Sequence, residues 1–251
     1  MSIKSKVFAA AAALTLIGGL GAVDTFTAGT AGAATPTCAD KCLNIFSLNF
    51  GTYPDPNFVL DVLRQGENVG QPIVLFRTAS TDPAEDFTVS VQGYVSTFYQ
   101  AGLVSSALEL HYAGDFAFEL EYSPYGVDSG LCMGTAVTAF YGSDVSLQPC
   151  GKTAKTIWLL DLADAAGITK PPPPPASPAS PTIEALPDEP YVPLINGSDT
   201  NFSHPFVLTY PTYGYPTDKP RPELITQTLK IDSHTAKNNN QEWGFDQGTL
   251  P

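Results

Sequence analysis

The chain has 251 residues, with 12 Lys and Arg residues against 25 Asp and Glu residues, and a formal net charge of −13. A surface this acidic repels nucleic acid and anionic lipid, and the sequence has no Lys/Arg cluster to overcome that repulsion. The composition therefore argues against nucleic acid as a partner, and the length is within the range of a single all-β domain.

Residues 1–34 have the order of a secretory signal peptide. Lys4 and Lys6 precede an apolar run, 7–20, which is too short to span a bilayer, and small residues end the segment. We expect cleavage after Ala33 or Ala34, secretion by a bacterial cell, and no membrane insertion. The alternative is a buried helix or an anchor. The signal peptide contains two lysines and one aspartate, so cleavage would leave a mature chain one charge more negative.

Four cysteines in an exported chain are permitted to pair, and they allow three connectivities. We favour Cys132 with Cys150, because they lie at the ends of two predicted strands and would staple that hairpin. Cys38 and Cys42 then form a tight local loop. The alternative is a metal site, but Cys-x3-Cys has no matching second pair and the chain has only three histidines. We expect neither a metal nor a cofactor.

Alternating apolar and polar residues predict strands at 88–95, 108–112 and 117–122. Gly114-Asp115, between the last two segments, has the composition of a hairpin turn. Few segments show a helical period, and short strands separated by turns favour a sandwich or a barrel.

A low-complexity segment, 170–190, contains five consecutive prolines followed by an acidic, proline-containing tail. Such a segment favours an extended, solvated conformation and is ordinarily a linker between domains. The roughly 60 residues beyond it would be marginal as an independent domain. We therefore predict a Pro-rich surface loop, after which the chain folds back onto the earlier part.

One pattern occurs three times: an apolar strand, a polar loop, a second apolar strand and a closing aromatic. The opening strands are 58–62, 131–135 and 206–210, the second strands are 73–76, 145–148 and 223–226, and the closing residues are Phe87, Trp158 and Trp243. The spacing is nearly constant, with 73 residues from Val59 to Cys132 and 75 from Cys132 to Val207. A fixed period marks one supersecondary unit that cannot bury its apolar face alone. The pattern predicts a pseudo-threefold all-β domain over 35–251, with repeats at about 38–90, 91–165 and 191–251.

These motifs resemble the ricin-type β-trefoil lectins. The resemblance rests on three motifs in each repeat. They are VLDV, NVGQPIVLF and EDF in the first repeat, LCMGT, DVSLQPCG and TIW in the second, and VLTY, PELIT and NQEW in the third. The resemblance implies a six-stranded barrel capped by three hairpins. The 45 residues from Phe87 to Cys132 and the 49 from Trp158 to Val207 exceed a compact repeat. We therefore predict extra hairpins as well as the Pro-rich surface loop.

The resemblance also implies a sugar site, formed in those lectins by the first-strand Asp, an aromatic that ends the second strand, and the Asn before the closing motif. The first repeat retains Asp61 and Phe76, the third retains Asn240 and Gln241, and no repeat keeps the whole set. Each residue has a structural alternative: Asp61 as a turn cap or a solvated side chain, Phe76 as core, and Gln241 as a brace for the hairpin cap.

A separate candidate for ligand contact is Tyr213, in the Tyr-, Gly- and Pro-rich stretch 210–216. Tyrosines in an exposed loop offer large contact area at low entropic cost. The alternative is a loop that packs against itself.

Motifs for catalysis are absent from the sequence. His111, His204 and His234 lack a neighbouring nucleophile motif, and the Glu119–Glu121 pair is expected to lie on a solvated strand face rather than to act as a glycosidase dyad. We expect no enzyme, but a secreted protein that binds a carbohydrate, a cell-surface glycan or another surface polymer. The alternatives are a structural or protein-interaction module with a protein partner, and a secreted hydrolase with an unrecognised site.

Overall fold

The structure is a computed structural model that describes Cys38 and residues 42–47, 51–52, 55–56, 58–79, 82–151, 153–161, 191–211, 223–230 and 239–247. The predicted signal peptide, the Pro-rich segment 170–190, Tyr213 and His234 lie outside these residues.

The described part is mostly strand. The strands are β1 Leu43–Ser47, β2 Gly51–Thr52, β3 Asp55–Pro56, β4 Phe58–Val62, β5 Ile73–Arg77, β6 Phe87–Tyr94, β7 Phe116–Tyr122, β8 Leu131–Thr135, β9 Val145–Pro149, β10 Ile157–Leu160, β11 Leu194–Asn196, β12 Phe206–Thr209, β13 Ile225–Thr228 and β14 Trp243–Gln247. The α-helices are α1 Val95–Gln100 and α2 Ser106–Tyr112, and short 3-10 helices are η3 Leu63–Gln65, η4 Pro83–Glu85, η5 Pro124–Gly126, η6 Ala154–Thr156 and η9 Asn239–Gln241.

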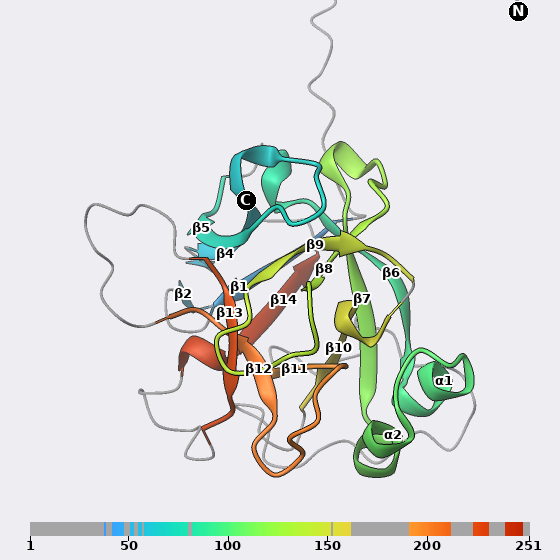
Figure 1. Ribbon diagram of the computed structural model, residues 1–251. Helices are drawn as coiled ribbons and strands as arrows, with labels where there is room; N and C mark the ends of the chain where they lie inside the picture. Colours follow the sequence, from blue (N-terminus) through green and yellow to red (C-terminus); the bar gives the residue numbers. More distant parts are fainter. Residues whose placement is uncertain are drawn as a thin grey trace, which may run out of the picture. The chain divides into compact units, whose positions relative to one another are not determined.

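The strands β14, β1, β6, β7, β10 and β11 form a closed antiparallel barrel (Figure 1). The ring closes just before β11, where Val192 and Trp243 exchange two backbone hydrogen bonds of 3.0 Å. The three closing aromatics lie opposite equivalent barrel residues. These pairs are Leu43↔Phe87, Phe118↔Trp158 and Val192↔Trp243. The barrel therefore repeats its pairing pattern three times.

Three hairpins, β4–β5, β8–β9 and β12–β13, extend from this barrel and meet around a pseudo-threefold axis. Equivalent isolated bridges join each hairpin to the next. The bridges are Pro72↔Ser146, Asp144↔Ile225 and Glu223↔Val74. Gly70 and Gly142 hold equivalent positions beside them, with the same φ of +86°, and donate their N–H groups to Leu147 and Thr226. A residue with a Cβ would be strained in this conformation. Barrel and cap together make an all-β, trefoil-like fold.

The third hairpin differs by one residue from the alignment of its sequence. The sequence placed Glu223 first in the second strand, whereas the bridges give that position to Leu224. The three equivalent residues are fully buried or nearly so: Ile73, Val145 and Leu224. A one-residue shift turns every side chain of a strand to the opposite face. Glu223 therefore faces away from the core, at the position that Pro72 and Asp144 hold in the other repeats.

The main core lies inside the barrel and beneath the hairpins. Trp158 and Trp243 are both 0 % exposed and donate equivalent hydrogen bonds, from Nε1 to the carbonyl oxygens of Met133 (2.9 Å) and Leu208 (3.0 Å). Phe87 is the counterpart in the first repeat and lacks the indole donor. The repeated unit thus buries its closing ring against its own opening strand, as the period predicts.

The prediction of a strand at 108–112 is wrong, because these residues belong to α2. Ser105 caps this helix by accepting a 3.1 Å hydrogen bond from the N–H of Leu108. The helical pair α1–α2 is inserted between β6 and β7 and lies beside them (Figure 1). The long gap after Phe87 therefore contains most of β6, this helical pair, the barrel strand β7 and η5, and the insertion here is helical rather than the predicted extra hairpin.

Both expected disulfides are present: Cys38–Cys42 and Cys132–Cys150. The second joins β8 to the residue after β9, as predicted for the middle hairpin. Among the described residues, no helix combines the length and the hydropathy required to cross a membrane.

Candidate functional site

The sugar-site residues of the first repeat lie on one face of the hairpin β4–β5. Asp61 pairs with Val74, and Phe76 is two residues further along β5, on the same face as Val74. Phe76 is partly exposed, but Asp61 is only 1 % exposed. We call each repeat, with its hairpin, a lobe. A sugar hydroxyl cannot reach a carboxylate that is this deeply buried unless the first lobe opens.

Glu85 takes the place next to Asp61 where the closing motif of the third repeat has Gln241. Its two oxygens accept hydrogen bonds from the N–H of Ala79 (2.7 Å) and the hydroxyl of Thr78 (3.0 Å). Burial raises the pKa of Glu85 from 4.5 to about 8; these hydrogen bonds lower the pKa, and the charges of Asp82 and Asp61 raise it. Glu85 is therefore protonated at neutral pH.

We expect the Glu85→Gln substitution to stabilise the protein at alkaline pH. In the native protein the unfolded carboxyl loses its proton near pH 4.5 and the folded one near pH 8, so stability is full at low pH and falls between these values. The glutamine oxygen can still accept from the N–H of Ala79, its NH2 group can donate to the Thr78 hydroxyl oxygen instead of accepting from it, and the amide carries no proton to lose in this pH range. Urea unfolding near pH 9 should show a gain on the order of a few kcal/mol, and unfolding near pH 4 almost none. If the free energy of unfolding of the native protein and of the Glu85→Gln variant changed with pH in parallel, the assignment would be contradicted. Glu109→Gln, on α2, is the control.

The corresponding site of the second repeat is filled by protein. Gly134 replaces the aspartate, and a Cβ there would lie 2.6 Å from the carbonyl oxygen of Lys155 and 2.9 Å from Cγ2 of Thr156. The backbone of η6 thus occupies the space that a ligand would need.

The third repeat uses its two retained amides internally. Asn240 is 2 % exposed and donates to the carbonyl oxygen of Tyr210 (2.9 Å). Gln241 is 1 % exposed and donates to the Thr209 hydroxyl (3.1 Å) and the Thr228 carbonyl (3.0 Å). Both side chains brace the lobe, and the structure does not bring them together with Asp61 and Phe76 in one site.

Glu119 and Glu121 are buried, contrary to the expected solvated face. Glu119 accepts from the N–H of Gly151 (2.9 Å) and the hydroxyl of Thr156, and Glu121 accepts from the N–H of Gly130 (2.7 Å). Both carboxylates hold loops in place.

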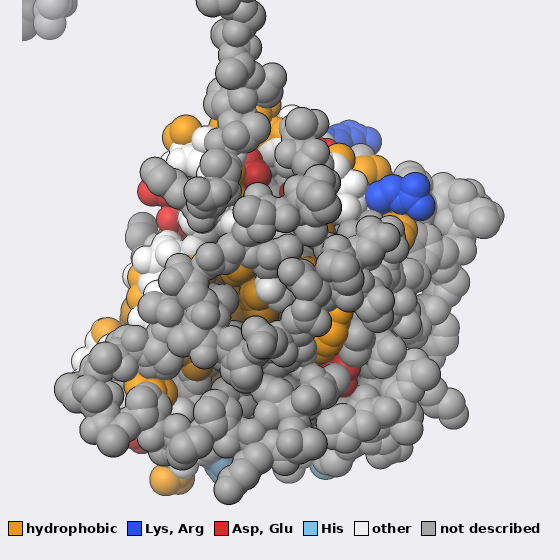
Figure 2. Space-filling model, turned by 180° about the vertical axis from the view of Figure 1, so that it is seen from behind, with side chains coloured by type: hydrophobic (Ala, Val, Ile, Leu, Met, Phe, Trp, Pro, Cys, Tyr) orange, Lys and Arg blue, Asp and Glu red, His pale blue; other side chains and the backbone are white. Residues whose placement is uncertain are grey.

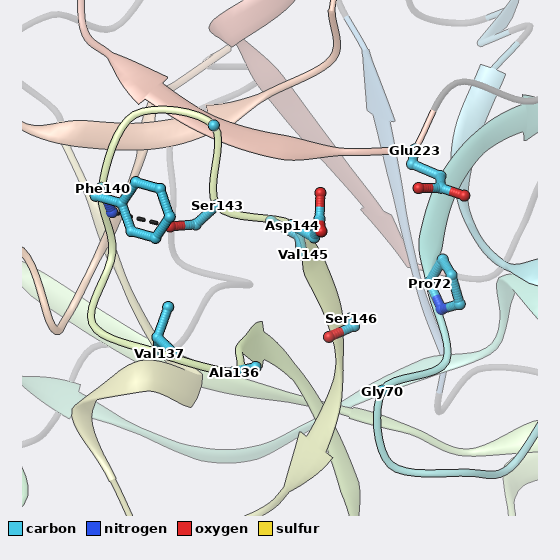
Figure 3. Close-up of a pocket in the computed structure, with 11 residues that line it drawn as sticks. Gly70, Pro72, Ala136, Val137, Phe140, Ser143, Asp144, Val145, Ser146 and Glu223 are labelled. Atoms are coloured by element: carbon cyan, nitrogen blue, oxygen red, sulfur yellow. Dashed lines mark hydrogen bonds between the residues drawn. The ribbon is translucent and has the colours of Figure 1, made fainter.

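A different site lies at the hairpin cap, where a cavity of about 330 Å³ opens beside the pseudo-threefold axis. This volume is at the small end of the range typical of ligand pockets. Its apolar side is formed by Val137 and Phe140, and its polar side by Asp144 and Glu223 from two different hairpins (Figure 3). Val137 is 52 % and Phe140 53 % exposed, so both offer apolar surface to solvent.

The loop that carries Val137 and Phe140 is fixed at several points. The carbonyl oxygen of Phe140 accepts from the Thr226 hydroxyl (2.7 Å), and its N–H donates to the Ser143 hydroxyl (3.0 Å). The carbonyl oxygen of Val137 accepts from the Thr135 hydroxyl (2.7 Å). The exposed side chains therefore stand on a rigid backbone, which lowers the entropic cost of binding.

The charge of the cavity is negative. Its lining among the described residues contains two carboxylates and neither Lys nor Arg. The ammonium of Lys155, in η6, donates to the carbonyl oxygen of Ala136 in this loop (2.9 Å). On the face drawn in Figure 2, the described basic side chains lie together near the upper right edge, and acidic side chains are spread more widely.

The sequence patterns did not reveal this cavity. The one available signal is the apolar composition of the loop 136–141, AVTAFY, where a hairpin loop is ordinarily polar. That Asp144 and Glu223 lie at the same cavity follows only from the register of the third hairpin.

No family model matches the sequence, and a search of the curated proteins found no match. Solved structures similar to the chain include the designed threefold symmetric protein ThreeFoil, with a TM-score of 0.47, 11 % identity, and coverage of 81 % of this chain and 96 % of that one. An agglutinin of Rhizoctonia solani matches with a TM-score of 0.41 and 13 % identity, covering 82 % of this chain and 95 % of that one. A mosquitocidal holotoxin gives 0.44 and 8 %, covering 83 % of this chain and 17 % of that one. At these values the likeness carries no inference about function, and the trefoil-like arrangement follows from the strand pairings.

Proposed function

We propose that this is a secreted, non-catalytic protein that binds a carbohydrate or a surface polymer at the hairpin-cap cavity. One observation carries the proposal: a rigid loop keeps Phe140 exposed at the rim of a cavity that also contains two exposed carboxylates, Asp144 and Glu223. An aromatic or aliphatic surface suits the C–H face of a sugar ring, and carboxylates accept hydrogen bonds from its hydroxyls. The two disulfides suit an oxidising, extracellular compartment.

The cap is a better candidate than the lobe sites, because its polar groups are accessible. Asp61, Asn240 and Gln241 are each at most 2 % exposed, and the two amides already have protein partners. Phe76 alone remains partly exposed.

A glycan array, followed by a pull-down with insoluble polysaccharides, tests the proposal. We expect the Phe140→Ala variant to bind the recognised glycan about tenfold more weakly, since a central aromatic contact is commonly worth that much. Tyr99→Ala, which removes an exposed aromatic from α1, is the matched control and should bind normally.

Two outcomes would contradict this assignment. Binding that is lost in Phe76→Ala but kept in Phe140→Ala would move the site to the first lobe. Capture of a protein partner through Val69 and Tyr141, which are 59 % and 61 % exposed beside the cavity, with no glycan bound, would favour the protein-interaction alternative.

A further inference from the structure

We infer that the sugar bound at the hairpin cap carries a positive charge, as in a polymer of amino sugars with free amino groups. This inference rests on the proposed function and specifies its ligand. It begins from the placement of Asp144 and Glu223, which hold equivalent positions in the second and third repeats.

Strand pairing places these two carboxylates on one surface. Asp144 lies opposite Ile225, and Glu223 precedes Ile225 by two residues, so the side chains of Asp144 and Glu223 are diagonal neighbours on the same face. Leu224, which lies between Glu223 and Ile225 in the sequence, points to the opposite face and is 0 % exposed. Figure 3 shows both carboxylates at the same cavity.

Neither carboxylate has a hydrogen-bond donor among the described residues that would satisfy or neutralise it. Two like charges on neighbouring strands repel each other, and the chain as a whole has a formal charge of −13. A cationic ligand relieves this repulsion, whereas an anionic sugar increases it. The ammonium of Lys155 donates to the carbonyl oxygen of Ala136 and supplies one positive charge beside the loop, against the two negative charges of Asp144 and Glu223.

The apolar wall determines what kind of cation fits. Phe140 offers a ring face that attracts both an ammonium group and the C–H groups of a pyranose. An amino sugar presents an ammonium, hydroxyl groups and an apolar face within one ring, and so matches all three features of the cavity. A lysine side chain offers an ammonium and a methylene stem but no hydroxyl groups and no pyranose ring face, so it matches fewer features of the cavity.

The test compares two oligosaccharides of equal length, the glucosamine hexamer and the N-acetylglucosamine hexamer, by calorimetry at a pH at which the free amine is protonated. We expect the glucosamine hexamer to bind about tenfold more tightly. Asp144→Asn and Glu223→Gln, both at exposed positions, should each remove most of that preference and weaken the salt dependence of binding. Glu109→Gln removes a carboxylate from α2 and should leave the preference unchanged.

Equal affinity for both hexamers, with sensitivity to Phe140→Ala, would overturn the inference and leave the proposed function standing. Hexalysine bound as tightly as the glucosamine hexamer would also overturn it, because charge alone would then explain binding. A preference that persists in both carboxylate variants would place the charge recognition elsewhere. If neither hexamer binds while another glycan on the array binds through Phe140, the inference fails alone; if no glycan binds, the proposed function fails with it.

Discussion

The Trp158→Ala variant should lose about 3–5 kcal/mol of its free energy of unfolding, which is the usual cost of removing a large buried aromatic. Trp158 is 0 % exposed, and its Nε1 donates a 2.9 Å hydrogen bond to the carbonyl oxygen of Met133. The substitution leaves both a cavity and an unsatisfied buried carbonyl. Urea unfolding monitored by circular dichroism measures the change.

The pseudo-threefold arrangement supplies the controls for this experiment. Trp243→Ala should cost about as much, because Trp243 makes the equivalent hydrogen bond to Leu208. Trp158→Phe should cost less, since Phe87 fills the corresponding position of the first repeat without an indole. A Trp158→Phe variant as unstable as Trp158→Ala would show that the repeats are not interchangeable at this position.

Removal of the Cys132–Cys150 disulfide should be the second large effect. The bond joins residues 18 apart, and restricting the unfolded chain to that extent is worth about 3 kcal/mol. The double variant Cys132→Ala/Cys150→Ala is compared with the native protein by chemical unfolding. The pair Cys38–Cys42 joins residues only 4 apart, so its removal should cost less, about 2 kcal/mol. A larger loss from the shorter loop would contradict the chain-entropy account.

The repeats could be predicted from the sequence because their apolar residues alone define them. Leu60, Met133 and Leu208 are each at most 1 % exposed. Because these positions must stay apolar, the three repeats can be aligned from the sequence. The polar positions carry no such constraint. The third hairpin was therefore aligned one residue out, at the point where Glu223 precedes Leu224.

The helix α2 was mistaken for a strand because alternation over five residues fits both structures. A strand would place Leu108 and Leu110 on one face, whereas Leu108 is 0 % and Leu110 79 % exposed, because residues two apart on a helix face different ways. The signal that distinguishes the two is the N-cap: Ser105 accepts from the N–H of Leu108. In a segment this short, the cap is more informative than the period.

The candidate site could not be predicted from the sequence, for a different reason. Val137, Phe140, Asp144 and Glu223 come from two hairpins that are far apart in the sequence and meet only in the folded chain, through contacts such as the Asp144↔Ile225 bridge and the hydrogen bond from Thr226 to Phe140. Conversely, Asp61 and Gln241 kept the residue types of a sugar site, but only the structure shows that they are buried. Residue identity could be aligned from the sequence; accessibility depends on how the lobes pack.

The position of the cavity beside the pseudo-threefold axis has a consequence for valency. A lobe site can recur once in each repeat, whereas the axis occurs once in the fold, and its three equivalent positions are held by the unlike residues Pro72, Asp144 and Glu223. A ligand bound there finds one site per chain. A single chain that binds through its cap would decorate a polymer without cross-linking it.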